Sequence, residues 1–283
     1  MKKILLTGDQ GFMASRFYSY YRGQYDFILL NRHNMDMTDE TQVYNLFKEQ
    51  SIDIVFHAAA IADIGVCQRD PELARRTNLQ ATVNIARGCA LKNSIMVFAS
   101  SDQVFSGNAG GGPFAEDDQA IPDNIYAESK LAAEREIAAI VEHYYNLRLT
   151  WMFSLPERNK KINGGIILNV MEALMTGNPI ELNDQDYRGM TYVYEVIENF
   201  EKIIELPSGT FHAGSENNWS VYEIGKVIAK VLHSSHRIEE VIHCGNGPRK
   251  DLRISNQKLR SLQVYFSDTE QAIRRCISDF RMG

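Results

Sequence analysis

Short apolar runs alternate with stretches of helical periodicity through the first half of the chain. The apolar runs lack the in–out alternation of half-exposed strands, which indicates strands buried on both faces. Since parallel strands joined by helices cross over in the right-handed sense, we predict an α/β fold with a doubly wound parallel sheet, a Rossmann fold. The predicted strands are 2–7, 26–30, 53–60, 94–101 and 147–153. The predicted helices are 12–21, 38–50 (capped by Asp36 or Thr38), 71–92 (with Pro71 in its first turn) and 125–145.

After Phe153 the pattern loosens into helices mixed with loops that contain glycine and asparagine. No low-complexity linker divides the chain, so we expect two lobes in one polypeptide. Residues 1–153 are predicted to form the dinucleotide-binding domain, with 189–214 returning to it. Residues 154–188 and 215–283 are predicted to form a smaller C-terminal α/β lobe for the substrate, with a cleft between the lobes.

Composition excludes several classes of protein. The chain has 283 residues, 44% hydrophobic and 23% charged, as in a globular protein with a large core. Its net charge of −6 argues against a nucleic-acid partner. No apolar run reaches the ~18 residues of a membrane span, and the short run after Met1 is a strand rather than a secretion signal. The four dispersed cysteines predict reduced thiols in a cytoplasmic protein, and no spacing of histidines or cysteines predicts a metal site.

The segment TGDQGFMA (7–14) joins the first predicted strand to the first predicted helix, where a dinucleotide-binding turn lies. Gly8 permits the tight turn, Gly11 lets a pyrophosphate approach the backbone, and Ala14 allows close helix–strand packing. The helix N-terminus offers N–H groups and partial positive charge to phosphates. The alternative is a glycine turn with a structural role only. The predicted cofactor-binding residues here are Thr7, Gly8, Gln10, Gly11, Phe12 and Met13.

The second predicted strand ends at Asn31 and Arg32, where NAD-binding folds usually carry an acidic residue for the ribose 2′-hydroxyl. An arginine favours the 2′-phosphate of NADP through charge-assisted hydrogen bonds, with Arg16 as a possible helper. We therefore predict NADP(H) in preference to NAD(H), with Asp36 and Met37 also at the cofactor. The alternatives are a solvated loop charge for Arg32 and a capping role for Asp36.

Three side chains with acid–base chemistry are predicted beside this cofactor. Ser101 ends the fourth predicted strand, and ligands of doubly wound sheets lie at the carboxyl ends of strands. Tyr126 and Lys130 are four residues apart in a predicted helix and so share one face. A free tyrosine has a pKa near ~10, which a nearby ammonium and a cationic nicotinamide ring lower. We predict that Tyr126 donates a proton, that Lys130 tunes it and that Ser101 polarises a carbonyl.

These motifs together resemble the extended short-chain dehydrogenase/reductase family, and in particular the dTDP-4-dehydrorhamnose reductases. SSDQVFSG (100–107) is similar to that group's STDYVFDG. PFAEDDQAIPDNIYAESKLAAE (113–134) follows its Pro-aromatic-x-Glu and Tyr-x-x-x-Lys-Leu-x-x-Glu pattern. TWMF (150–153), NDQDYRGMT (183–191) and RKDLRISNQKL (249–259) resemble its later motifs, so the similarity runs nearly end to end.

The resemblance implies an NADPH-dependent reductase of a keto group on a nucleotide-activated sugar, as in dTDP-rhamnose biosynthesis. By position, Ser101, Tyr126 and Lys130 correspond to the catalytic residues. Relatives often dimerise through the helix from Ile125, so a homodimer is one alternative, and packing of the same apolar stripe on the sheet is the other. The resemblance adds His57, Ala58, Ala59 and Asn78 at the cofactor, although a structural hydrogen bond explains Asn78 equally well. It places the substrate near Asp102, Val104, Phe105, Trp151, Arg188 and Arg249.

Two segments depart from the family pattern and leave the sugar open. ADIGVCQ (62–68) lacks the acidic residue and lysine of the family's TAVDKAE-like stretch, and Met190 replaces the proline of its DQxGxPT. Arg188 and Arg249 either neutralise a diphosphate or pair with carboxylates of their own lobe. Trp151 is either part of the core or a stacking platform.

Two other functions remain open from sequence. One is an epimerase or dehydratase with tightly bound NAD, although dehydratases usually carry an Asp-Glu pair where this chain has Asp102-Gln103. The other is a non-catalytic NADP-binding regulatory subunit, because the regulatory subunit of methionine adenosyltransferase also resembles this family. The intact set of Ser101, Tyr126 and Lys130 argues against the second.

Overall fold

The computed structural model describes residues 1–280, which divide into two compact units. Unit 1 comprises Met1–Asn108, Asp118–Leu149 and Asn199–Phe211. Unit 2 comprises Ala109–Asp117, Thr150–Glu198 and, of the described residues, 212–280. Within the described residues, no helix is long and apolar enough to cross a membrane.

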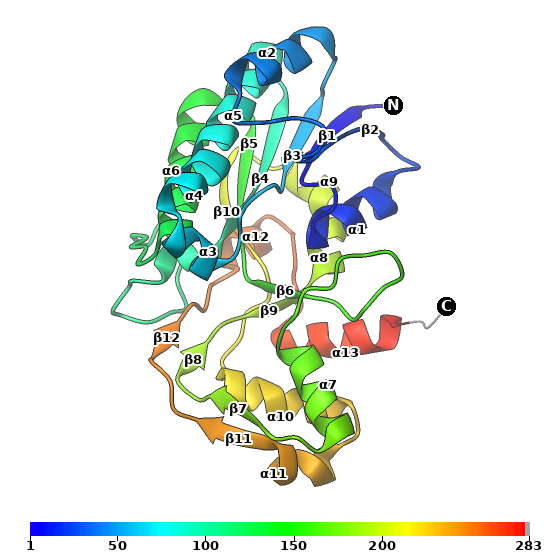
Figure 1. The fold of residues 1–283 in the computed structure, drawn as a ribbon, viewed down its shortest axis with the longest axis vertical. Helices are drawn as coiled ribbons and strands as arrows, with labels where there is room; N and C mark the ends of the chain where they lie inside the picture. Colours follow the sequence, from blue (N-terminus) through cyan, green and yellow to red (C-terminus); the bar gives the residue numbers. More distant parts are fainter. Residues whose placement is uncertain (281–283) are drawn as a thin grey trace. The chain divides into compact units, whose positions relative to one another are not determined.

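Unit 1 is built on a sheet of six strands in the order β10–β5–β4–β3–β1–β2 (Figure 1). The β1–β2, β1–β3, β3–β4 and β4–β5 pairs are all parallel. The strand order reverses direction at β1, which is the switch point where ligands of such sheets bind. The predicted doubly wound fold is confirmed. The strands are β1 Lys3–Thr7, β2 Asp26–Leu30, β3 Ile54–His57, β4 Ile95–Ser101, β5 Tyr144–Leu149 and β10 Gly209–Ala213.

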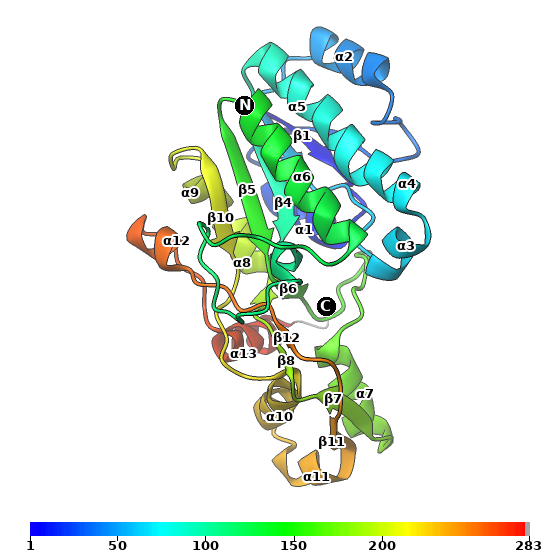
Figure 2. The same cartoon turned by 90° about the vertical axis from the view of Figure 1, so that its left-hand side faces the viewer.

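Helices cover both faces of this sheet (Figures 1 and 2). One face carries α2, α5 and α6, and its core includes Phe47, Ile85, Phe98 and Ile137. The other face carries α1 and α9, where the rings of Phe17 and Phe200 pack edge to face with centroids 4.7 Å apart. The helices are α1 Phe12–Tyr21, α2 Glu40–Glu49, α3 Ile64–Arg69, α4 Pro71–Arg75, η1 Arg76–Gln80, α5 Ala81–Lys92, η2 Asp102–Phe105, α6 Ile125–Ile140 and α9 Phe200–Ile203.

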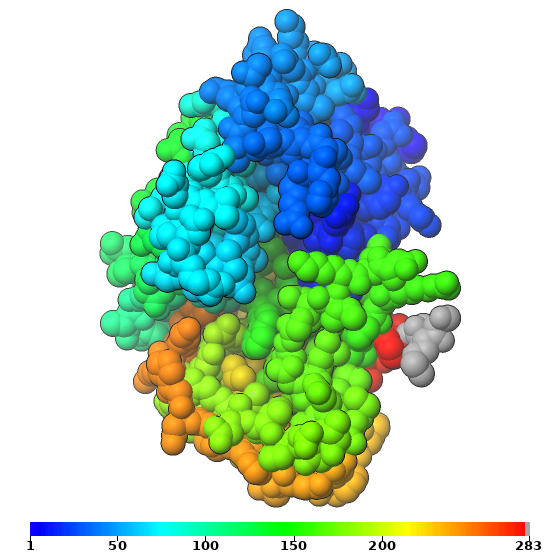
Figure 3. All heavy atoms as spheres, in the orientation of Figure 1, coloured from blue at the N-terminus to red at the C-terminus, as the bar shows by residue number. Residues whose placement is uncertain are grey.

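The structure divides the single helix predicted for residues 71–92 into three consecutive helical segments, α4, η1 and α5. Pro71 occupies the first turn of α4 as predicted, but a five-residue π-helix, η1, separates α4 from α5. π-helical turns are rare and concentrate at functional sites, and this one carries the buried Asn78. The segment from α3 to η1 forms part of the surface of unit 1 on the face shown in Figure 3, in cyan.

Two other helix predictions need correction. Helix 38–50 is shorter at its start, because Asp39 rather than Asp36 or Thr38 caps α2 by accepting from the N–H groups of Thr41 and Gln42. Helix 125–145 ends at Ile140, where the backbone turns extended at Val141. Tyr144 and Tyr145 belong instead to β5, where aromatic residues pack well on the pleated surface.

Unit 2 contains three two-stranded sheets around its own core. β6 pairs with β9, β7 with β11 and β8 with β12, all in parallel. Helices α7, α10 and α13 supply much of the core, and a capping box of Ser220 and Glu223 begins α10. The strands are β6 Trp151–Phe153, β7 Ile180–Asn183, β8 Asp186–Tyr187, β9 Met190–Tyr192, β11 Ile242–Gly245 and β12 Lys250–Asp251. The helices are α7 Ile166–Thr176, α8 Val193–Glu198, α10 Val221–Val231, η3 Ser235–Arg237, α11 Ile238–Val241, α12 Gln257–Ser261 and α13 Thr269–Asp279.

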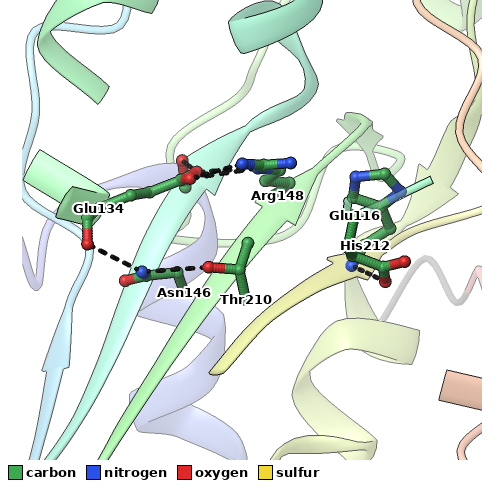
Figure 4. Close-up of polar contacts among 7 residues, drawn as sticks. Glu116, Glu134, Asn146, Arg148, Thr210 and His212 are labelled. Carbon is green, nitrogen blue, oxygen red and sulfur yellow. Dashed lines mark hydrogen bonds and ion pairs between the residues drawn. The ribbon is translucent and has the colours of Figure 1, made fainter. Parts of the chain in front are cut away.

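The unit boundaries differ in detail from the predicted domains. TWMF (150–153) was expected to complete a strand of the Rossmann sheet, but its strand β6 pairs with β9 in unit 2. For the same reason only 199–211, rather than all of 189–214, returns to unit 1. Residues 109–117 join unit 2, where Glu116 accepts from the backbone N–H of His212 at 2.8 Å (Figure 4).

Candidate active site

The glycine turn after β1 packs tightly on the end of β3. Gly8 has a φ of +68°, which side-chain-bearing residues rarely adopt, and a Cβ there would lie 2.9 Å from the Cα of Ala59. A Cβ on Gly11 would lie 2.9 Å from the carbonyl oxygen of Gly8, which accepts the Gly11 N–H at 2.7 Å. Both positions therefore require glycine.

The start of α1 is open to an anion. Its N-cap residue is Gly11, so no side chain caps the helix, and its first turn contains no acidic residue. By contrast, Asp39 caps α2 and Asn124 caps α6. The positive end of the α1 dipole is therefore not neutralised within its own first turn. Of the predicted residues here, Gln10 is exposed, Phe12 is half-buried and Met13 is buried.

Thr7 and His57 shape the loop that follows β3. The Thr7 hydroxyl lies 2.8 Å from His57 Nδ1 and accepts the N–H groups of Ala58 and Ala59, each at 3.1 Å. His57 Nε2 lies 2.9 Å from the Thr82 hydroxyl, which donates to the carbonyl of Asn78. Thr82 therefore accepts from Nε2–H, and Nδ1 accepts from Thr7, so the ring is neutral.

Burial, and next the charge of Lys130, lower the pKa of His57 to about 3. The His57 side chain is fully buried, so it supports the loop from beneath, and the half-buried Ala58 and Ala59 form its accessible part. Asn78 supports the same loop. Its Oδ1 accepts the N–H of Ile61 at 2.8 Å and its Nδ2 donates to the Ile61 carbonyl at 3.0 Å. The hydrogen bonds of Asn78 therefore show a structural role, the alternative to cofactor binding that the sequence left open.

The end of β2 supplies a cation without a carboxylate partner. Arg32 is exposed and makes no hydrogen bond or ion pair with residues 1–280. Asn31 donates from its side chain to Asp9 at 3.0 Å, which ties this strand end to the glycine turn. Asp36 accepts from both the N–H and the hydroxyl of Thr38, which fixes the loop before α2, while Asp39 caps that helix. The Met37 carbonyl accepts from Asn84.

Ser101, Tyr126 and Lys130 come together beside the end of β4. Ser101 is the last residue of β4 and is buried, and its hydroxyl lies close enough to the Tyr126 side chain to act on the Tyr126 pKa. The Ser101 hydroxyl also accepts the Gln103 N–H at 3.2 Å. Lys130 Nζ lies 5.8 Å from the Tyr126 ring centroid and 4.5 Å from that of Phe98, and it donates to the Ala99 carbonyl at 2.7 Å.

Burial controls the charges of this site. Desolvation raises the pKa of Tyr126 to about 12, against the lowering effect of the Ser101 hydroxyl. Desolvation also lowers the pKa of Lys130 to about 7, while Glu134 and Cys67 act in the opposite direction. The expected lowering of the Tyr126 pKa by Lys130 is therefore not a property of this chain by itself, because desolvation dominates and the ammonium is not among the groups that shift this pKa. The phenol is held protonated, as a proton donor requires.

The residues predicted to contact a substrate lie in both units. In unit 1, Asp102 is buried, and its Oδ1 accepts from the Ser101 hydroxyl at 3.2 Å. Val104 and Phe105 are fully buried because the 3₁₀ turn η2 directs them into the core, so substrate contact by their side chains is not supported. In unit 2, Trp151 packs partly buried against the core cluster of that unit.

Two arginines of unit 2 differ in their partners. Arg188 makes a bidentate ion pair with Asp186, at 2.9 Å from Nε and 2.7 Å from Nη2, and stacks over Trp151. Of the two roles predicted for Arg188, diphosphate binding and pairing with a carboxylate of its own lobe, the structure shows the second. Arg249 is exposed and makes no hydrogen bond or ion pair within residues 1–280.

Sequence reasoning missed Cys67 and the ion pair of Glu134 with Arg148. The Cys67 thiol is buried 3.3 Å from the Ile61 carbonyl and influences the pKa values of both Tyr126 and Lys130. Glu134 was visible as the last residue of the Tyr-x-x-x-Lys-Leu-x-x-Glu pattern. No cluster of potential metal ligands occurs in residues 1–280, and no disulfide joins the cysteines there.

Comparisons with known proteins agree with this architecture. Over 269 residues the chain is 23% identical to a dTDP-4-dehydrorhamnose reductase of Mycobacterium tuberculosis, covering 93% of this chain and 86% of that protein. It is 27% identical over 201 residues to the probable low-salt glycan biosynthesis reductase Agl14 of Haloferax volcanii, covering 71% of this chain and 66% of that protein. The crystal structure of the Bacillus anthracis dTDP-4-dehydrorhamnose reductase in complex with NADP superposes with a TM-score of 0.88 at 21% identity, covering 99% of each chain.

A family model assigns nearly the whole chain. The model of the RmlD substrate binding domain matches residues 1–277, which include the glycine turn, Ser101, Tyr126 and Lys130. The resemblance drawn from the sequence motifs is thereby confirmed. The chain belongs to the RmlD substrate binding domain family of extended short-chain dehydrogenases/reductases.

Proposed function

We propose that this protein is an NADPH-dependent reductase of a keto group on a nucleotide-activated sugar, similar to the dTDP-4-dehydrorhamnose reductases. The observation that carries the proposal is the placement of Tyr126 beside Ser101 at the end of β4, with Lys130 on the same helix face and its Nζ 5.8 Å from the Tyr126 ring centroid. Membership of the family and the NADP complex of the Bacillus anthracis relative support it.

The chain fits a dinucleotide. Gly8 and Gly11 form a tight backbone turn that leaves no room for a side chain at either position. The turn leads into the start of α1, which no side chain caps and which therefore suits a pyrophosphate. Arg32 suits a 2′-phosphate, because it is exposed and has no carboxylate partner within residues 1–280. We assign NADP(H) as the preferred cofactor, with NAD(H) as the weaker one. When bound, the reduced cofactor supplies hydride to the keto carbon.

The side chains of this site supply the proton. Ser101 donates a hydrogen bond to the keto oxygen and polarises the carbonyl. Tyr126 gives its phenolic proton to that oxygen as the alcohol forms, and the resulting phenolate is stabilised by the Lys130 ammonium. A tyrosine kept protonated by burial suits this direction of proton transfer, because donation requires the acid form at neutral pH.

The substrate and setting are also part of the proposal. Arg249 suits a nucleotide diphosphate because it is exposed and has no partner within residues 1–280, whereas Arg188 is neutralised by Asp186. Segment 62–68 departs from the family pattern, so the identity of the sugar has to be determined by experiment. We assign the protein to the cytoplasm as a possible homodimer in nucleotide-sugar metabolism.

The test is NADPH consumption by the purified protein with dTDP-, UDP- and GDP-linked 4-keto sugars. We expect turnover with the dTDP-linked sugar. Thermal stabilisation by NADPH without turnover on any sugar would instead favour a non-catalytic binding subunit. Stoichiometric NAD released from the purified protein by denaturation would favour an epimerase or dehydratase.

A further inference from the structure

A buried carboxylate lies one helical turn beyond Lys130, away from Tyr126. Glu134 is 4% exposed and receives three hydrogen bonds from Arg148 at 2.9 to 3.2 Å, two from Nε and one from Nη2 (Figure 4). The Ser100 hydroxyl also donates to Glu134 Oε1. The backbone carbonyl of Glu134 accepts from Asn146, which in turn donates to Thr210.

The sheet register fixes the partners of this carboxylate. Ser100 of β4 lies directly opposite Arg148 of β5. Arg148 is 6% exposed, and its guanidinium lies 5.1 Å from the ring centroid of Phe105. Burying such a pair is expensive, and buried ion pairs often add little to stability compared with apolar residues. The geometry therefore points to a role other than stability.

Glu134 shares its helix face with the proposed catalytic lysine. Residues four apart on a helix have Cβ atoms about 5–6 Å apart, so Glu134 is the carboxylate of α6 nearest to Lys130 on that face. The other titratable groups that act on the site are Tyr126 of α6, His57 of β3, Cys67 of α3 and Asp102 of η2. His57 is neutral, so it adds no charge near neutral pH.

We propose that Glu134, held by Arg148 and Ser100, is a positioning residue that keeps Lys130 in its ammonium form beneath Tyr126. The proposal rests on the proposed reductase function for its catalytic consequence. Burial favours the neutral amine, and a buried negative charge one turn away opposes it. Arg148 limits the effect, because its positive charge offsets part of the field of Glu134. Opposite substitutions in the pair should therefore act in opposite directions on Lys130.

The experiment compares the pH dependence of kcat in Glu134→Gln, Arg148→Gln and the double variant. Turnover needs the Tyr126 phenol and the Lys130 ammonium, so activity falls as pH rises through their coupled titration. Glu134→Gln removes negative charge, which lowers both pKa values and moves the alkaline limb down by about one to two pH units. Arg148→Gln removes positive charge and moves the limb up. The double variant returns it close to the wild-type position.

Glu136→Gln is the matched control. It makes the same change two residues away on α6, at an exposed position without a hydrogen bond or ion pair in residues 1–280. The alkaline limb of its pH–kcat profile is expected to lie at the wild-type position. A merely structural role for Glu134 predicts lower activity with no displacement of the limb. Absence of a displacement, or displacement in the same direction in both single variants, would overturn the proposal.

A second measurement does not depend on turnover. The folded-state pKa of Lys130 is about 7 and its ordinary value is 10.5, so between these values the unfolded chain holds the extra proton. The Lys130 contribution to stability therefore grows as pH rises above about 7. Urea unfolding should show that rise beginning about one to two pH units lower in Glu134→Gln, and higher in Arg148→Gln.

The two measurements separate failure of this proposal from failure of the proposed function. Displaced stability curves in a protein without reductase activity would retain the charge role of Glu134 and refute only the reductase assignment. Superimposable stability curves in folded variants would refute the role of Glu134, whatever the activity.

Discussion

The buried His57 should make the folded state sensitive to acid. Burial and the Lys130 charge hold its pKa at about 3, against an ordinary value of 6.5. At pH values between about 3 and 6.5, His57 is protonated in the unfolded chain but neutral in the folded chain. The His57 contribution to stability is therefore fully present above the unfolded value and is lost as pH falls through this window.

The size of the effect follows from the window. Each pH unit inside it corresponds to about 1.4 kcal/mol for one proton. Acidification by two units below the unfolded pKa should therefore remove about 2.5 kcal/mol through His57 alone. Glutamine can both accept from Thr7 and donate to Thr82, but it does not titrate. His57→Gln should lower stability at neutral pH yet abolish this part of the acid loss.

The assay is urea unfolding of both proteins at several pH values between about 4.5 and 7. Carboxylates titrate in both proteins, so their contributions cancel in the difference between the two curves. His33→Gln makes the same histidine-to-glutamine substitution at an exposed position. Its stability should depend on pH as that of the wild type does. Parallel curves for wild type and His57→Gln would refute the neutral, buried histidine and with it the assigned hydrogen-bond chain.

The glycine turn and the cofactor pocket give two further predictions. Gly8→Ala should cost about 1–3 kcal/mol in urea unfolding, because of the positive φ and the contact with Ala59, whereas Gly23→Ala, which meets no atom within 4 Å, should not destabilise through a clash. An equally stable Gly8→Ala protein would argue against the packed turn. Arg32→Ala should raise the Kd for NADPH about tenfold and leave that for NADH nearly unchanged, as measured by fluorescence titration. Equal losses for both would argue against a 2′-phosphate contact.

The parts of the fold that local chemistry determines could be predicted from sequence. Helix α1 and strand β2 begin and end where the pattern placed them, because Gly11 starts the helix and a buried apolar run makes the strand. The helix face that joins Tyr126 to Lys130 also follows from spacing alone. These features depend on residues close together in the chain.

The features that escaped prediction depend on distant partners. The π-helical turn at Asn78 accompanies hydrogen bonds to Ile61, seventeen residues away, which no local pattern reveals. The strand β10 joins a sheet whose other members precede it by more than fifty residues. The raised pKa of Tyr126 follows from burial, whereas spacing indicated only the neighbouring ammonium.

The central claim is that Tyr126 protonates a keto oxygen, and the most direct test is kcat for Tyr126→Phe with NADPH and the dTDP-linked keto sugar. We expect kcat to fall by at least about 100-fold, with an unchanged Kd for NADPH. Tyr44→Phe, at a 50% exposed position on α2, is the control and should retain full activity. Wild-type kcat in Tyr126→Phe would contradict the assignment of Tyr126 as the proton donor.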